Sequence, residues 1–236
     1  MKRFYSTAQI AETDGGFAVK LDGRPVKTPA GKPLTLPTAA LAQGVADEWN
    51  AQGETVGDEI DPATMPLMRL CGTAIDRIAD LRGGLLEGLQ RYVDTDLLCY
   101  RAGHPQDLVE KQDRVWQPLL DWAAEALGLR MRVVEGVLPI EQDAAAHDAV
   151  RAALHDLDDW RLTALGDLVG ISGSIVIGLA ILRDRLDAEG AFEACMLDEL
   201  HQAERWGDDH EAVERRKHIR ADIASTARFF ELLKTS

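Results

Sequence analysis

The segment from Leu197 to Gly207 carries the residue types best suited to a functional site. On a helix, Glu199, Gln202 and Trp206 stand at positions i, i+3 and i+7, so they share one face. This arrangement places a carboxylate and an amide beside a large aromatic ring. A carboxylate in such surroundings is partly desolvated and needs a cationic or hydrogen-bonding partner.

The identity of that partner separates three interpretations of Glu199. The partner can lie within this chain, which makes Glu199 a structural residue. It can lie on a bound protein, where aromatic and charged anchors dominate the binding energy, and then Glu199, Gln202 and Trp206 form a binding site. Glu199 can also act as a single catalytic acid or base, although no second acid stands at a defined spacing from it.

Motifs for nucleotides, metals and nucleophilic catalysis are missing from the sequence. There is no GxxxxGK[ST] loop, no GxGxxG following a strand, no HExxH and no GxSxG. Asp94 and Asp96 could offer oxygens to a cation, but the glycine and distal glutamate of a calcium loop are lacking, which favours a helix cap or a turn. We therefore expect no cofactor, no metal site and no enzymatic activity.

Charge and hydropathy restrict the partners and the compartment. The formal net charge is −14 over 236 residues, which disfavours binding to nucleic acid. The longest apolar stretch, 171–182, is too short to span a membrane and predicts a core helix. The start of the chain has no apolar signal-peptide core, and the three cysteines form no CxxC pair. These features predict a cytoplasmic protein without membrane insertion, and we expect a monomer.

The elements that position this segment divide the chain into two parts. Residues 1–64 predict a small antiparallel β-rich domain, because Asp22-Gly23 between two β-prone runs is a strong hairpin signal. Further strands are expected within 3–10 and 34–36. Thr38 is expected to cap a helix whose apolar face, with Leu41, Val45 and Trp49, covers the sheet.

Residues 65–236 show helical periodicity nearly throughout. Amphipathic segments are expected on both sides of Gly83-Gly84, around 108–127, and from Asp143 to the end, with Asp208 capping the last helix. The predicted fold class is therefore α+β, with a small β-rich N-terminal domain followed by a larger helical domain of orthogonal bundle-like character.

Several motifs occur in one order along the chain. They are Phe4-Tyr5, Asp22 to Pro29, Leu36-Pro37-Thr38, Ala46 to Trp49 with Gln52, Asp61-Pro62 with Met65-Pro66, Thr73 to Asp76, Asp94 to Arg101, Gln112 with Trp116 and Pro118, Glu199 with Gln202, Trp206 and Gly207, and Arg215-Arg216. Together they resemble the assembly chaperone family of the F1-ATP synthase α subunit, which is found in mitochondria and some bacteria.

The resemblance implies a chaperone that binds the free α subunit, prevents its aggregation, and releases it by exchange with β. It also implies that Glu199 is functionally important, whereas Gln202 and Trp206 join it through the shared helical face. Organellar relatives would act in the mitochondrial matrix. Two alternatives remain: an enzyme or ligand-binding protein that uses Glu199 as acid or base in a cleft between the domains, and an adaptor with several clients.

Overall fold

The computed structural model describes residues 1–234, except for the side chain of Ala79. The chain forms two compact units, one from Met1–Leu81 with the segment from Arg228 onward, and one from Arg82–Ala227. The predicted boundary between residues 64 and 65 falls inside the first unit, and the division into domains 1–64 and 65–236 stays a prediction. No helix in the described part of the chain is long and apolar enough to cross a membrane.

The first unit contains a four-stranded antiparallel sheet, as the sequence predicts. Its strands are β1 (Ala8–Thr13), β2 (Gly16–Leu21), β3 (Arg24–Pro25) and β4 (Thr35–Leu36), and β2 pairs with each of the others. Asp22 and Gly23 form the predicted turn with φ of 45° and 84°, the positive values that a tight hairpin turn requires. The edge strand predicted within 3–10 instead begins at Ala8.

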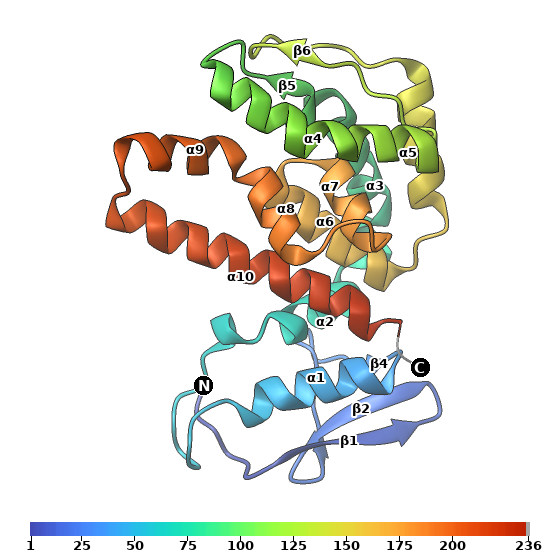
Figure 1. Ribbon diagram of the computed structural model, residues 1–236. Coiled ribbons are helices and arrows are strands. Elements are labelled where there is room, and N and C mark those ends of the chain that lie inside the picture. The colour runs from blue at the N-terminus through green and yellow to red at the C-terminus, as the bar shows by residue number, and fades with distance from the viewer. Residues whose placement is uncertain (235–236) are drawn as a thin grey trace. The chain divides into compact units, whose positions relative to one another are not determined.

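Helix α1 (Ala39–Asn50) lies along the β1–β2 hairpin (Figure 1). Thr38 caps it as predicted, because its side chain accepts a hydrogen bond from the Leu41 amide at 3.1 Å. Leu41 and Val45 are fully buried and Trp49 is 7% exposed, so the predicted apolar face forms the core beneath the helix. The Tyr5 hydroxyl donates to the Trp49 carbonyl oxygen and joins the N-terminal segment to the end of α1.

The remaining helices of the first unit begin after a short 3-10 turn, η1 (Pro62–Thr64). They are α2 (Pro66–Asp76) and the start of α3 (Ile78–Thr95), which continues into the second unit. The sequence-based break at Gly83-Gly84 is wrong, because α3 runs through both glycines and the interruption falls at Arg77. Each glycine in a helix costs only about 1 kcal/mol relative to alanine, which tertiary packing can outweigh.

The second unit is helical, apart from η2 (Leu97–Cys99) and a parallel pair formed by β5 (Tyr100–Arg101) and β6 (Val134–Glu135). All eight residues of α7 (Ile175–Leu182) are buried, so part of the apolar stretch 171–182 forms a core helix as predicted. The helix begins later than predicted, because residues 171 and 172 belong to the preceding helix, which ends at Gly173. Besides the end of α3, the other helices of the second unit are α4 (Gln106–Leu127), α5 (Ala144–His155), α6 (Asp159–Ser172), α8 (Ala188–Cys195), α9 (Leu197–Trp206) and α10 (His210–Leu232), whose residues from Arg228 onward belong to the first unit.

Two local features complete the description of the second unit. Asp209, not Asp208, caps α10, because its carboxylate accepts a hydrogen bond from the Ala212 amide at 2.8 Å. All three cysteines are free thiols. Burial raises the pKa of Cys99 and of Cys195 to about 12, and it raises the pKa of Cys71 well above its usual value.

Candidate functional site

Helix α9 carries all three residues that the sequence proposes as a site. Glu199 lies in its first turn and Trp206 is its last residue. Gln202 is exposed, and Trp206 is 77% exposed. The i, i+3, i+7 spacing therefore brings the three residues onto one side of an observed helix, and the aromatic ring stands in solvent.

The partner of Glu199 lies within this chain. One carboxylate oxygen is 2.9 Å from a guanidinium nitrogen of Arg216, and the other accepts a hydrogen bond from Arg215. Arg216 is 7% exposed and also donates a hydrogen bond to Asp208. Its hydrogen bonds, chiefly the one to Asp208, raise the pKa of Arg216. Glu199 thus joins α9 to α10, which matches the structural interpretation of this residue.

The opposite side of α9 is attached to α4 by polar contacts. Arg205 pairs with Asp107 at 2.7 Å, and the Gln112 amide donates to Asp198 at 2.7 Å. Lys111 pairs with Glu204 and lowers the pKa of that carboxyl. These contacts hold α9 along much of its length.

His201 is the buried residue of the α9–α4 contact. It is 3% exposed, and its ring nitrogens have no hydrogen-bond partner among residues 1–234. The nearest carboxylate oxygen, on Asp107, is 3.7 Å from Nε2. His201 therefore serves as a packing residue in the interface between α4 and α9.

Trp206 stands where this attachment ends. Figure 1 shows α9 and α10 as consecutive helices joined by the short segment 207–209. Gly207 has φ of 84°, a backbone conformation that suits glycine and turns the chain away after the tryptophan. Trp206 is therefore exposed to solvent at the end of α9. Ion pairs hold this helix to α4 on one side and to α10 on the other.

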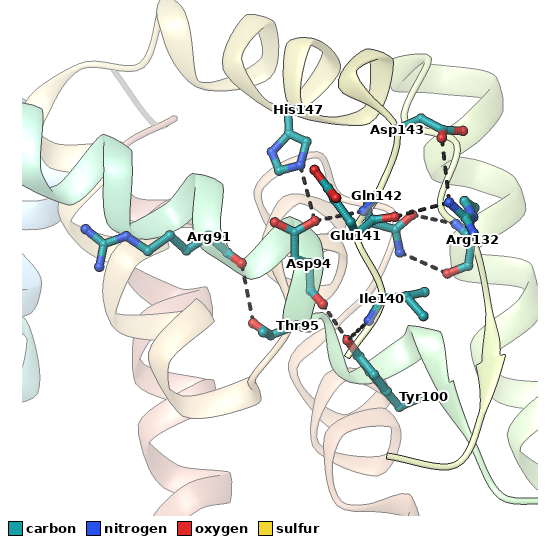
Figure 2. A network of polar contacts seen from close by, with 10 residues as sticks. All are labelled: Arg91, Asp94, Thr95, Tyr100, Arg132, Ile140, Glu141, Gln142, Asp143 and His147. Carbon is teal, nitrogen blue, oxygen red and sulfur yellow. Dashed lines mark hydrogen bonds and ion pairs between the residues drawn. The ribbon is translucent and has the colours of Figure 1, made fainter. Parts of the chain in front are cut away.

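A second polar cluster surrounds Asp94 in the last turn of α3 (Figure 2). Its carboxylate accepts from the Gln142 amide at 2.9 Å and lies 3.2 Å from His147 Nε2. The Gln142 side chain bonds the backbone of Arg132 in both directions, at 2.7 and 2.9 Å. The cluster therefore closes the loop 132–142 at its base and connects it to α3 and α5.

The tip of that loop is apolar and exposed, which sequence reasoning did not find. Val137 is 89% exposed and Leu138 is 76% exposed. Their types alone gave no sign of this, because apolar residues in a mostly helical chain are expected in the core. The sequence also did not predict that Glu199 pairs with Arg215 and Arg216, although Arg215-Arg216 is among the motifs that carry the resemblance.

The two aspartates considered as cation ligands have structural partners. Asp94 belongs to the cluster just described, whereas Asp96 caps η2 by accepting from the Leu98 amide at 3.0 Å. Within the described part of the chain, no group of three His, Cys, Asp or Glu side chains could hold a metal ion. Asp96 therefore acts as the helix cap that the pattern favoured, whereas Asp94 connects α3 to the loop 132–142 and to α5.

Comparison with known proteins gives one consistent result. The family model described as ATP12 chaperone protein matches residues 2–124, just over half of the chain. The crystal structure of Atp12 from Paracoccus denitrificans has a TM-score of 0.90 and 43% identity, with 98% of each chain covered.

Two curated relatives are similar along most of the chain. Protein atp12, mitochondrial, from Schizosaccharomyces pombe is 28% identical, over 96% of this chain and 81% of the relative. Protein ATP12, mitochondrial, from Saccharomyces cerevisiae is 24% identical, over 91% and 79%. With its fold shared with the Paracoccus protein and its sequence matched by the family model, this chain belongs to the ATP12 chaperone protein family.

Proposed function

We propose that this chain is an assembly chaperone for F1-ATPase that binds the free α subunit and releases it by exchange with β. Membership of the ATP12 chaperone protein family carries this proposal. A free subunit destined for a ring exposes apolar surface that would otherwise aggregate, so a chaperone must cover that surface reversibly.

The client contact that we propose centres on Trp206, with Gln202 beside it. Tryptophan is enriched among the residues that dominate protein–protein binding energy, because its large ring buries much area. Trp206 is 77% exposed, and a ring of this size gains much from being covered by a partner. Gln202, one turn earlier on α9, offers an amide that can bond a client backbone.

Glu199 has a different role in this proposal. Its carboxylate already engages Arg215 and Arg216, so it positions α9 against α10. A fixed helix loses less conformational entropy when it binds, which strengthens binding without a new contact. Glu199 therefore acts on the client through the orientation of Trp206 and Gln202.

Release by competition is consistent with the sequence. The chain has no GxxxxGK[ST] phosphate-binding loop, so we propose that the β subunit displaces the chaperone without nucleotide hydrolysis. Moderate affinity of the chaperone for the α subunit suits this role, because the β subunit must displace the chaperone from the same surface of α. We further propose that the chain acts as a monomer in the compartment where the α subunit is made, the bacterial cytoplasm or, for organellar relatives, the mitochondrial matrix.

The test is capture of freshly synthesised F1 α subunit by the immobilised chain. The controls are the β subunit and an unrelated aggregation-prone protein. Selective capture of α that added β reverses without nucleotide is the expected result. Equal capture of the unrelated protein would indicate a general adaptor instead, and a strict nucleotide requirement for release would contradict exchange by competition.

A further inference from the structure

The first unit contains a half-open pocket of about 480 Å³. This volume lies in the range of about 300–1,000 Å³ that is typical of pockets for small ligands and anchoring side chains. Its walls come from Met1, Pro29, the end of α1, the segment 60–65 that contains η1, and one side of α2. Trp49, Ile60 and Met65 supply a buried apolar floor, each no more than 7% exposed.

Trp49 is the unusual member of this floor. Its ring packs edge-on against Tyr5 at a centroid distance of 5.7 Å, which fixes its orientation. Its Nε1–H is buried and has no hydrogen-bond partner among the described residues. Most buried donors in folded proteins are bonded, which makes this unsatisfied N–H unusual.

The charged residues of the pocket come from α2 and the residue that ends it. Arg69 and Arg77 supply two guanidinium groups and are exposed, whereas Asp76 supplies one carboxylate. Asp76 is already engaged, because it accepts from the Thr28 hydroxyl at 2.7 Å and from the Ala30 amide at 3.0 Å. Arg77 lies close enough to Asp76, and Arg69 to Glu48, to act on the pKa of those carboxyls. Among the residues that line the pocket the guanidinium groups still outnumber the carboxylates, which favours an acidic group on the occupant.

We propose that this pocket is a second client contact that takes an aromatic or long aliphatic side chain of the α subunit. An acidic residue next to that anchor is held by Arg77 at the rim. The inference rests on the proposed function, since the chaperone role supplies a partner with exposed apolar side chains. Met68, which also lines the pocket, suits an apolar anchor because its flexible side chain adapts to different shapes.

The test uses the full chain in two variants that act on different parts of the pocket. Thr73→Trp fills the pocket from α2, and Arg77→Glu reverses the charge at the rim. Arg24→Glu is the matched control, because Arg24 is an exposed arginine of the same unit that does not line the pocket. The readout is the chaperone concentration that half-saturates capture of F1 α subunit.

We expect that concentration to rise about tenfold for each pocket variant and to stay unchanged for Arg24→Glu. If Thr73→Trp does not fold, as judged by its thermal unfolding, Arg77→Glu decides the outcome alone. If the wild-type chain captures α and the folded pocket variants capture it equally strongly, the pocket contact is overturned and the proposed function stays intact. Failure of the unmodified chain to capture α would overturn both.

Discussion

The carboxylate of Asp96 and the hydroxyl of Ser174 are bonded in the interior of the second unit, with Ser174 Oγ 2.8 and 2.9 Å from the two carboxylate oxygens. Both residues are fully buried. Asp96 also accepts from the Val176 amide at 3.1 Å, so one side chain connects the end of α3 to the start of α7. Burial raises the pKa of Asp96 to about 6, although its hydrogen bonds oppose that shift.

The raised pKa of Asp96 predicts a specific pH dependence of stability. Between its unfolded pKa of 3.8 and its folded pKa of about 6, the folded protein binds more protons than the unfolded chain. The contribution of Asp96 to stability is therefore fully present below pH 4 and is lost as pH rises through 6. Replacing Asp96 with a residue that does not titrate removes this dependence.

We expect the free energy of unfolding of Asp96→Asn, relative to wild type, to rise by about 2–3 kcal/mol between pH 4 and pH 7. Urea denaturation at several pH values measures this difference. Asp121→Asn, an exposed change on α4 in the same unit, should give a curve parallel to wild type. If the stability of Asp96→Asn also changes with pH in parallel with wild type, Asp96 is not the source of the pH dependence.

Glu48 predicts a stability effect in the first unit. Its carboxylate on α1 accepts from the Leu67 and Met68 amides at 2.7 and 2.8 Å, and so caps α2, which has no side-chain cap of its own. We expect Glu48→Ala to lower the free energy of unfolding by about 1–3 kcal/mol, and Glu48→Gln to cost less because one carbonyl oxygen remains.

The neighbouring Asp47 provides the control for Glu48, because it is exposed and its carboxylate bonds only to Gln43 among the side-chain hydrogen bonds seen in the described residues. Asp47→Ala should change stability by less than about 0.5 kcal/mol. Denaturant titration at pH 7 separates the two variants. Equal losses would show that Glu48 acts as an ordinary surface residue and not as the cap of α2.

We expect replacement of Trp206 to weaken client binding without lowering stability. Because the ring is 77% exposed, Trp206→Ala should change the free energy of unfolding by less than about 0.5 kcal/mol. Capture of F1 α subunit should weaken at least about tenfold. Leu138→Ala is the matched control, since Leu138 is 76% exposed in the same unit, and it should bind like wild type.

For Glu199 we expect a loss of stability as well as a loss of client binding. Glu199→Gln removes one charge from the cluster with Arg215 and Arg216, and we expect a stability loss of about 1–2 kcal/mol, because Arg216 is left with less compensation while largely buried. Amide hydrogen exchange should become faster in 197–216. Client capture should weaken as well, through the altered position of α9.

Glu204→Gln is the control for that variant, because it makes the same chemical change on the same helix. The Glu204 side chain is 63% exposed and pairs with Lys111, and exposed pairs contribute at most about 1 kcal/mol. Unchanged stability of Glu199→Gln together with lost capture would instead place Glu199 in direct contact with the client. Unchanged stability with unchanged capture would remove it from the site.

The sequence by itself determined the features that depend on close neighbours. The Asp22-Gly23 turn follows from the positive φ that these residues accept, and Thr38 caps α1 because its side chain reaches an amide three residues away. Helical periodicity likewise identified most helices and the shared face of Glu199, Gln202 and Trp206. The ordered motifs indicated the family that the comparisons confirm.

Only the tertiary structure decided which partners distant residues find. Asp96 meets Ser174 across 78 positions of the chain, and Glu48 caps a helix that begins beyond a turn. Local propensity likewise could not predict that α3 continues through Gly83-Gly84, because tertiary packing outweighed the small cost of each glycine in the helix. Exposure of Trp206 and Leu138 depends on which surfaces other elements cover, and residue spacing does not encode that.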